Sequence, residues 1–440
     1  MAATAAPERL AAPPQPRPGG GRLAHAWPRS PVAFRVATGI LCVHIIDDNF
    51  LQPQSGTQAG DHLVSGLVPI ALLLGIAAVY PRLRPGARAA WAITIGLFGV
   101  VMGASEAGYY SLAEGPSGDD FTGLLTIPAG LVLIAVGATT LWTTRRTDDR
   151  LARRYLRRLL LALGGVVVAY FLVFPLCLSY VFTHAARAGV PPPELGADYK
   201  QVAFRTADGL TLKGWYVPSR NGAAVIAAPG RAGSQRPARV LVRHGYGVLL
   251  FDRRGEGDSD GDPNAFGWSG ARDIRAAVAF LQRQPDVKDG RIGGIGLSVG
   301  GETLLQAAAE SGGLKAVVSD GAGSRSIRED LANPQSDAWA EVPTSLVISA
   351  GTTIFSNQSP PPNLKGLVSR ITRRPVLFIY GQHDQPNVRG LTPSYYKAAG
   401  QPKAIWQVPG ASHTGAIDSH PREYERRVIA FFDHALLAWK

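Results

Sequence analysis

Long apolar runs dominate the chain between residues 31 and 184, whereas shorter apolar runs alternate with polar stretches from residue 200 onward. Each of four long runs holds about 18 to 25 residues, enough for a helix to cross the ~30 Å apolar core of a bilayer. They are residues 63–80, 90–109, 121–142 and 159–182. A fifth run, residues 32–46, is shorter and contains Arg35 and His44, so whether it spans is left open. We therefore predict an α-helical transmembrane bundle of four or five helices.

The loops that join these segments alternate in charge. Two of them are rich in arginine: the loop after residue 80 and the loop between residues 145 and 158. The other loops carry acidic residues, namely Asp47, Asp48, Asp61, Glu114, Asp119 and Asp120. Because arginine-rich loops stay cytoplasmic, we predict a multi-pass protein of the cell membrane whose chain continues outside the cytoplasm after the last helix. The net charge of +12 follows largely from this topology, so we expect the lipid bilayer and no nucleic acid as a partner.

A group of ionisable residues falls near the predicted outer ends of these helices. It comprises His44, Asp47, Asp48, Asp61, His62 and Glu106. Helix ends at a membrane surface are commonly polar, which makes these residues interfacial. Ionisable groups at membrane depth are also often functional, which would make the group a polar or metal-binding cluster beneath the second half of the chain. The sequence leaves both interpretations open.

A serine motif stands out in the second half of the chain. Residues 296–300 read Gly-Leu-Ser-Val-Gly, follow an apolar run and precede a helix-like segment. This context predicts a tight strand-to-helix turn that exposes the hydroxyl of Ser298. Residues 257–261 also match the G-x-S-x-G pattern around Ser259, but charged residues precede them and Asp262-Pro263 follows. We therefore assign Ser298, and not Ser259, as the nucleophile.

Two further apolar runs end in residues that a serine nucleophile needs. The run 375–380 leads to Asp384, and the run 404–408 leads to a glycine-rich loop with His413. A serine hydroxyl needs an imidazole to take its proton, and the imidazole needs a carboxylate to fix its tautomer. Ser298, Asp384 and His413 follow in that order. His383 as the base and Asp320 as the acid remain alternatives.

From about Gln201 to its end, the chain resembles an α/β-hydrolase on these three motifs taken in order. Residues 245–259 also resemble the G-Y-x-V…D-x-R-G-x-G-x-S segment of that superfamily, which would make Ser259 a turn residue. After a strand at 223–228, Pro229 stands where the family usually has histidine. The resemblance implies an oxyanion hole made by the backbone N–H groups of Arg231 and Val299.

The resemblance also implies the fold of the second half, a mostly parallel sheet with helices on both faces. We predict a disordered leader over 1–30, a transmembrane helical domain over 31–184, a linker over 185–199 and an α/β-hydrolase domain over 200–440. The proline-containing insertion between the sixth and seventh strands would roof the serine. The two cysteines, Cys42 and Cys177, fall in apolar helices, so we expect no disulfide framework.

Together these features predict a membrane-anchored serine hydrolase that cleaves carboxylic esters. Ser298 would attack, His413 would move the proton and Asp384 would orient His413, with no metal or organic cofactor. The expected substrate is a small-molecule ester or acyl compound, and the sequence identifies no protein partner. A peptidase or acyltransferase with the same triad is one alternative. A catalytically inactive membrane binding or scaffold protein is the other.

Overall fold

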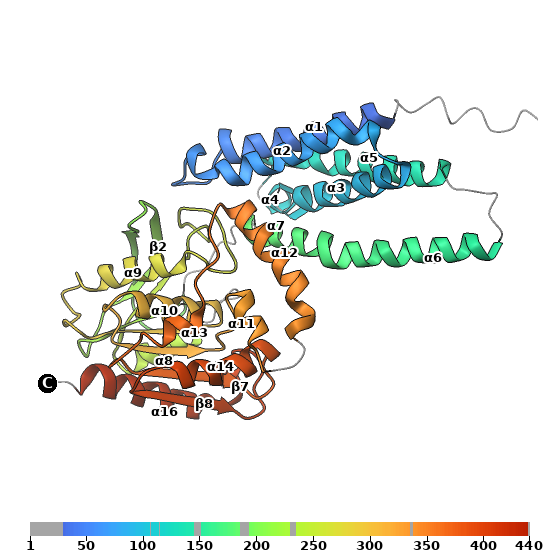
Figure 1. Ribbon diagram of the computed structural model, residues 1–440. Coiled ribbons are helices and arrows are strands. Elements are labelled where there is room, and N and C mark those ends of the chain that lie inside the picture. Colours follow the sequence, from blue (N-terminus) through green and yellow to red (C-terminus); the bar gives the residue numbers. More distant parts are fainter. Residues whose placement is uncertain are drawn as a thin grey trace, which may run out of the picture.

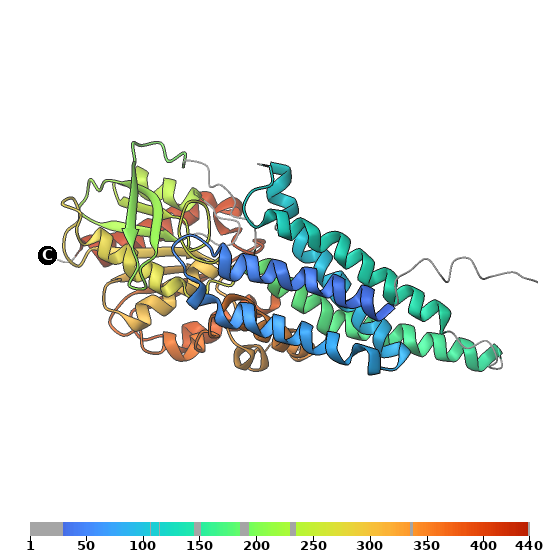
Figure 2. The ribbon, with the colours of Figure 1, turned by 90° about the horizontal axis from the view of Figure 1, so that it is seen from above.

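The computed structural model describes residues 30–105, 107–113, 115–144, 151–184, 193–228, 235–334 and 338–438 (Figure 1). The predicted leader up to residue 29 and residues 185–192 of the predicted linker lie outside the described residues. A region of long helices comes first along the chain. An α/β domain follows it and lies beside one end of the helices (Figures 1 and 2).

Seven α-helices make up the described part of the first region. They are α1 (Ser30–Ile46), α2 (Leu63–Val79), α3 (Pro85–Ser105), α4 (Ala107–Ala113), α5 (Asp120–Thr143), α6 (Leu151–Val168) and α7 (Phe174–Thr183). Short helical segments extend several of them: η1 (Asp47–Leu51), η2 (Ala59–His62), η3 (Tyr80–Arg82) and η4 (Ala169–Val173).

Within the described residues, five helical stretches are long and apolar enough to cross a membrane. They are Ser30–Leu51, Ala59–Arg82, Pro85–Tyr109, Asp120–Thr143 and Leu151–Thr183. The short run at 32–46 therefore lies in a helix of sufficient length. Its charged Arg35 is accommodated because the guanidinium Nε donates a hydrogen bond to the carbonyl of Ala77, at 3.3 Å.

Glycines bring α3 and α5 into close contact. A Cβ on Gly96 would stand 2.6 Å from the carbonyl oxygen of Gly130, and one on Gly130 would stand 2.5 Å from the carbonyl oxygen of Gly96. Small residues at such crossings let two apolar helices pack backbone to backbone, which compensates for the weak hydrophobic drive between helices in lipid. α1 also packs against α5.

The polar residues at the ends of these helices form short hydrogen-bonded chains. Thr122 links His44 to Asp47, with its Oγ1 3.3 Å from His44 Nδ1 and 2.7 Å from Asp47 Oδ2. His62 Nε2 lies 2.9 Å from Thr57 Oγ1. Asp61 Oδ2 accepts from the backbone N–H of Gln58 at 2.9 Å.

His184, which the sequence interpretation did not include, joins this polar group. Its Nε2 lies 3.9 Å from Asp48 Oδ2. Glu106 lies outside the described residues. Among the described residues, no three histidine, cysteine or acidic side chains converge in a way that could hold a metal ion.

The second region is built on one eight-stranded sheet. Its strands are β1 (Lys200–Arg205), β2 (Thr211–Val217), β3 (Ala224–Ala228), β4 (Gly247–Phe251), β5 (Ile292–Leu297), β6 (Ala316–Asp320), β7 (Val376–Gly381) and β8 (Lys403–Val408). They lie in the order β1-β2-β4-β3-β5-β6-β7-β8. β2 runs antiparallel to both β1 and β4, and all the remaining neighbours are parallel. This confirms the predicted mostly parallel sheet.

Helices cover both faces of the sheet because its central strands are apolar on both sides. Every residue of β3 to β7 is buried. The helices of this region are α8 (Arg236–Arg243), α9 (Gly270–Leu281), α10 (Val299–Glu310), α11 (Ile327–Leu331), α12 (Ala338–Ser356), α13 (Leu364–Val368), α14 (Pro386–Ala398), α15 (Ala416–Ser419) and α16 (Pro421–Phe432), followed by η5 (Asp433–Leu437). Residues of α9, α10 and α13 pack on one face, and residues of α8 and α16 pack on the other (Figure 1).

Parallel pairing brings the carboxyl ends of three central strands to one edge. Leu297 at the end of β5 pairs with Asp320 at the end of β6, and Asp320 pairs with Ile379 in β7. The residues that follow these strands therefore emerge side by side. This is the edge at which open parallel sheets hold their ligands.

Candidate active site

Ser298 occupies a strained turn between β5 and α10. Its backbone has φ 51° and ψ −121°, a conformation that a residue with a side chain rarely adopts. The backbone N–H of Ser298 donates to the carbonyl of Asp320 at 2.7 Å, which ties the turn to the neighbouring strand. The turn lifts the serine out of the sheet, as the sequence motif predicts.

Gly296 makes this turn sterically possible. A Cβ at this position would collide with the backbone of Gly300 and Gly301, where α10 begins. A Cβ on Gly301 would stand 2.7 Å from Ser319 Oγ in β6. Gly296 and Gly301 thus allow the strands and the helix to approach one another around Ser298.

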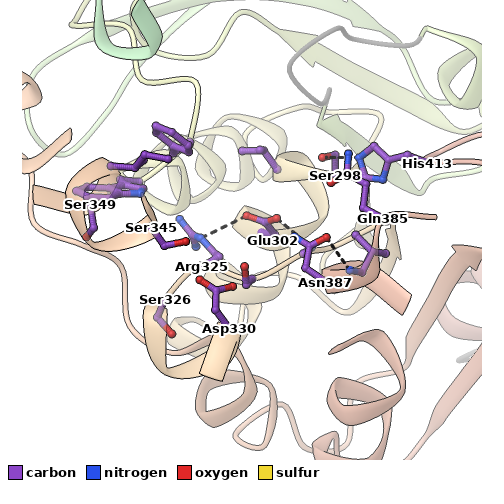
Figure 3. Close-up of a pocket in the computed structure, with 18 of the residues that line it drawn as sticks. Ser298, Glu302, Arg325, Ser326, Asp330, Ser345, Ser349, Gln385, Asn387 and His413 are labelled. Carbon is purple, nitrogen blue, oxygen red and sulfur yellow. Dashed lines mark hydrogen bonds and ion pairs between the residues drawn. The ribbon is translucent and has the colours of Figure 1, made fainter. Parts of the chain in front are cut away.

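His413 and Asp384 complete a hydrogen-bonded chain with Ser298. His413 Nε2 lies 3.0 Å from Ser298 Oγ, and His413 Nδ1 lies 2.7 Å from Asp384 Oδ1. Asp384 follows β7 and His413 follows β8, on loops at the same edge of the sheet as Ser298. Figure 3 shows His413 beside Ser298. The structure therefore brings together the three side chains that the sequence order proposed.

Asp384 is held rigidly beneath the imidazole. Its side chain is fully buried, and its oxygens accept hydrogen bonds from the backbone N–H groups of Gly381 at 3.2 Å and Gln385 at 2.8 Å. The hydrogen bond to Asp384 raises the pKa of His413 above its usual value, although burial of the ring opposes the rise. An imidazole with a raised pKa is a stronger acceptor for the serine proton.

The two alternative residues are placed differently. His383 is exposed and lies on the loop of Asp384, outside the hydrogen-bonded chain. Asp320 is fully buried at the end of β6, and neither of its carboxyl oxygens has a hydrogen-bond partner among the described residues. Burial raises the pKa of Asp320 to about 7, and the negative charge of Asp384 adds to the rise. Asp384, and not Asp320, is the carboxylate bonded to His413.

Of the two proposed oxyanion donors, only Val299 lies among the described residues. Arg231 lies outside the described residues. Val299 begins α10 directly after Ser298, so its backbone N–H belongs to the first turn of a helix. N–H groups of a first helical turn lack intrahelical partners and carry the positive end of the helix dipole, which suits them to a developing oxyanion.

Ser259 has a structural place. Its side chain is fully buried, and its Oγ donates to the carbonyl of Asp252 at 2.8 Å and accepts from the backbone N–H of Lys213 at 2.9 Å. The hydroxyl joins the loop after β4 to strand β2. Gly257, two residues earlier, has φ 51° and provides the turn.

A pocket of about 430 Å³ lies beside Ser298 and His413. Its walls come from the turn after β5, the loop after β6, the beginning of α14, the loop before α9 and helix α12. α12 contributes Ser345, Ile348 and Ser349, so the insertion between β6 and β7 does form part of the wall. Pockets of this size fit small organic ligands.

Two charged residues of the wall form a pair that sequence reasoning did not assign to the site. Arg325 is 1% exposed at its side chain, and its Nε lies 3.6 Å from Glu302 Oε2 (Figure 3). Glu302 Oε1 accepts from the backbone N–H of Gly323 at 3.0 Å. Arg325 also donates to the carbonyl of Gly267 at 3.1 Å and to the side chain of Gln306. The pair holds the loop after β6 in place, and only its position in the fold reveals this, because no motif marks Arg325.

Comparison with known proteins agrees with this architecture. Residues 199–366 match the X-Pro dipeptidyl-peptidase (S15) family. The chain is 31% identical over 221 residues to the uncharacterized protein Rv2307c of Mycobacterium tuberculosis (strain ATCC 25618 / H37Rv), an alignment that covers 49% of this chain and 72% of that protein. The chain belongs to the α/β-hydrolase superfamily. The family match includes Ser298 and ends before Asp384 and His413. The assignment of those two residues to the site therefore rests on the geometry.

Two further similarities concern proteins of other organisms. The uncharacterized protein YfhR of Escherichia coli (strain K12) is 26% identical over 249 residues, which cover 54% of this chain and 81% of that protein. The solved structure of the Pyrococcus furiosus esterase Pf2001 aligns with a TM-score of 0.46 and 24% identity, covering 57% of this chain and 98% of the esterase.

Proposed function

We propose that this α/β-hydrolase is a membrane-anchored serine hydrolase that cleaves carboxylic esters through an acyl-enzyme. The hydrogen-bonded chain Asp384–His413–Ser298, at the edge of a ligand-sized pocket, is the observation that carries the proposal. The base, His413, lies within hydrogen-bond distance of the nucleophile on one side and of the orienting acid on the other, as this chemistry requires.

The chemistry would proceed in two halves. Ser298 Oγ attacks the ester carbonyl while His413 Nε2 takes the serine proton, and Asp384 stabilises the imidazolium that results. The N–H groups of Val299 and Arg231 would hold the oxyanion. The tetrahedral intermediate then releases the alcohol, which takes its proton from His413. Water, activated by His413 in turn, hydrolyses the acyl-enzyme and frees Ser298.

Fluorophosphonate labelling tests the nucleophile directly. The full chain should be labelled and should turn over a soluble ester. Ser298→Ala should abolish both. Ser259→Ala is the matched control, because it removes a serine of the same sequence pattern that lies outside the hydrogen-bonded chain, and it should keep the label. Loss of labelling only in the Ser259 variant would reassign the nucleophile, and an unlabelled wild-type chain would favour the inactive scaffold.

A peptidase is the second candidate, favoured by the match to the S15 family. Ester and amide substrates use the same three residues, so the pocket and not the triad would separate them. Turnover of 4-methylumbelliferyl butyrate should be compared with that of an X-Pro p-nitroanilide. The ester proposal predicts a higher kcat/KM for the butyrate, and a clear preference for the anilide contradicts it.

Membrane anchoring is supported by the five apolar helices and by the arginines that lie between them in the sequence. The segment predicted as an arginine-rich loop at 145–158 is helical from Leu151, so Arg153, Arg154, Arg157 and Arg158 belong to the first half of α6. The proposed orientation places the hydrolase domain outside the cytoplasm. A reporter that functions only outside the cytoplasm, fused after Lys440, should be active. Activity of a cytoplasm-only reporter at the same position would contradict the orientation.

A further inference from the structure

Helix α7 lies directly behind the wall of the pocket beside Ser298. Two elements of that wall contact α7. Ser179 Oγ on α7 lies 3.1 Å from the carbonyl oxygen of Ile348 in α12 and shares its single proton between this oxygen and the carbonyl of Pro175, at 2.8 Å. Phe182 on α7 packs edge-on against Phe266, with ring centroids 5.2 Å apart. Ile348 and Phe266 both line the pocket, so α7 supports the wall on two sides.

The end of α12 lies among the apolar helices. Phe355 stacks on Phe98 of α3 and meets Tyr180 of α7 edge-on, each with ring centroids 5.6 Å apart. Gly351 approaches α7 so closely that a Cβ there would stand 2.7 Å from Ser179 Oγ. α12 is therefore a wall of the pocket on one side and a member of the helical region on the other (Figure 1).

The proposed position of the bilayer indicates how deep the contacts between α7 and the pocket wall lie. The uncharged part of the last span begins at Leu159, directly after Arg157 and Arg158. About 20 helical residues, each rising ~1.5 Å, cross a core of ~30 Å. The outer boundary of the core then falls near residue 178. Ser179 and Phe182, which hold the pocket wall, therefore lie at the level where the ester groups of lipids are found.

The exposed surface of α6 could contact the apolar chains of lipid-like molecules up towards the outer boundary of the bilayer core. None of the residues of α6 is buried by the described part of the chain. Its exposed apolar side chains include Leu159, Leu160, Leu161, Leu163, Val166 and Val167. From Leu159 to its end α6 is apolar all round, and such a helical surface is suited to contact with lipid. η4 continues this surface with exposed Tyr170 and Leu172; it runs directly into α7 and packs against α12.

The lining of the pocket is amphiphilic. Phe266, Trp268 and Ile348 supply apolar surface, and Phe266 and Ile348 belong to the elements that touch α7. Arg325, Asn387 and Ser345 supply hydrogen-bonding groups (Figure 3). Such a lining fits a molecule with a polar group at one end and an apolar chain at the other.

We propose that the substrate is an amphiphilic carboxylic ester that reaches Ser298 sideways from the outer leaflet of the membrane. Its polar group occupies the pocket, and its apolar chain lies along α7 and α12. This inference rests on the proposed hydrolase activity and membrane orientation, and it narrows the substrate class to esters that reside in the bilayer.

Cross-linking from Ser298 locates the chain. The full-length protein in phosphatidylcholine vesicles is treated with a hexadecyl fluorophosphonate that carries a diazirine at the end of its chain. Ser298 Oγ bonds to phosphorus, fluoride leaves, and His413 takes the serine proton. Irradiation should then attach the chain end to residues 169–183, to residues 338–356 or to phosphatidylcholine.

The cross-linking experiment gives different results if the lateral route is wrong and if the proposed hydrolase activity is wrong. Labelling of Ser298 with cross-links only to α14 or α16 overturns the lateral route and leaves the hydrolase in place. A chain that is never labelled at Ser298 overturns the hydrolase and this inference with it.

A pair of variants tests the same route by kinetics. Phe182→Glu places a charge beside the proposed path, and Phe121→Glu makes the same change at an exposed position of α5, which packs against α1 and α3. The readout is kcat/KM for 4-methylumbelliferyl oleate in phosphatidylcholine vesicles, divided by that for 4-methylumbelliferyl butyrate in solution.

Phe182→Glu should lower this ratio by about ten-fold or more, because a carboxylate beside an apolar chain is costly at membrane depth. Phe121→Glu should leave it within about two-fold. An unchanged ratio in Phe182→Glu, with normal butyrate turnover, contradicts the route. If Phe182→Glu also loses butyrate turnover, the wild-type cross-linking experiment decides the matter.

Discussion

Two segments of the hydrolase domain share the pattern G-x-S-x-G and place their serines in opposite situations. Ser298 stands on a strained turn between a strand and a helix, partly accessible and hydrogen-bonded to His413. Ser259 is fully buried and joins a backbone donor to a backbone acceptor. A buried hydroxyl that joins a loop to a strand by hydrogen bonds leaves no room for a substrate. The surrounding elements, and not the five residues, therefore decide which serine is available for chemistry.

The same contrast recurs for the other two members of the hydrogen-bonded chain. His413 and His383 both follow strands at the same sheet edge, where Asp384 follows β7 and Asp320 is the last residue of β6. In each pair, one residue belongs to the hydrogen-bonded series Asp384–His413–Ser298 and the other does not. Each pair therefore supplies its own control.

The histidine pair should show the largest effect. His413→Ala removes the proposed acceptor of the serine proton, and kcat for the soluble butyrate ester should fall by about 10⁵- to 10⁶-fold. His383→Ala changes an exposed side chain and should leave kcat within about two-fold. Steady-state kinetics on the two purified variants measure both. Equal losses would show that His413 is not the base.

The acid pair should follow. Asp384→Asn removes the charge that stabilises the imidazolium and permits the wrong tautomer, so kcat should fall by about 10³- to 10⁴-fold. Asp320→Asn should cost less than about ten-fold, because Asp320 makes no hydrogen bond to His413 among the described contacts. The reverse order would place the catalytic acid at the end of β6.

The structural role of Ser259 can be tested by its effect on the thermal stability of the protein. Ser259→Ala leaves the N–H of Lys213 and the carbonyl of Asp252 without their partner, which typically costs ~1–3 kcal/mol for a buried group. The Tm of the hydrolase domain should fall by a few degrees, while fluorophosphonate labelling of the folded protein persists. Ser419→Ala, at an exposed serine, should leave the Tm unchanged. A Tm that is the same in both variants would contradict the structural role of Ser259.

The smallest expected effect concerns the buried carboxyl of Asp320 and its dependence on pH. Its pKa rises from 3.8 to about 7 on folding, so the folded state holds this proton more tightly than the unfolded state does. The stability that this group contributes is therefore complete below pH 3.8 and is lost as pH rises through 7.

Asp320→Asn removes this titration, so the fall in Tm between pH 5 and pH 8 should be smaller in the variant than in the wild-type chain. Thermal unfolding at the two pH values, with the Asp384→Asn variant as a comparison, measures the difference. Parallel pH profiles for wild type and Asp320→Asn would contradict the raised pKa.

Much of the α/β domain was predictable because its strands are short, apolar and bounded by glycine or proline. The run at 375–380 corresponds to β7 (Val376–Gly381), and the run at 404–408 corresponds to β8 (Lys403–Val408). Ser298, Asp384 and His413 each follow such a run, so local pattern and chain order were enough to group them. The same pattern favoured Ser298 over Ser259.

Contacts between distant parts of the chain were not predictable in this way. Arg325 has no motif, and it belongs to the pocket only because the loop after β6 folds towards Glu302. His184 follows α7, yet it lies near Asp48 at the end of α1. Helix α12 contains Pro343, and nothing in its local pattern indicates that it packs on α7.

The docking of α12 against α7 has a consequence for how the protein is assembled. The bond between Ser179 and Ile348 joins residues that are 169 positions apart. During synthesis α7 is complete long before α12 has been made, and β1 to β6 lie between them in the chain. The wall of the pocket therefore closes late, against a partner that has already taken its place. Contacts of such long range form slowly. A nascent chain that stops before residue 338 would contain Ser298 in its turn but would lack both the roof of the pocket and its link to the helices.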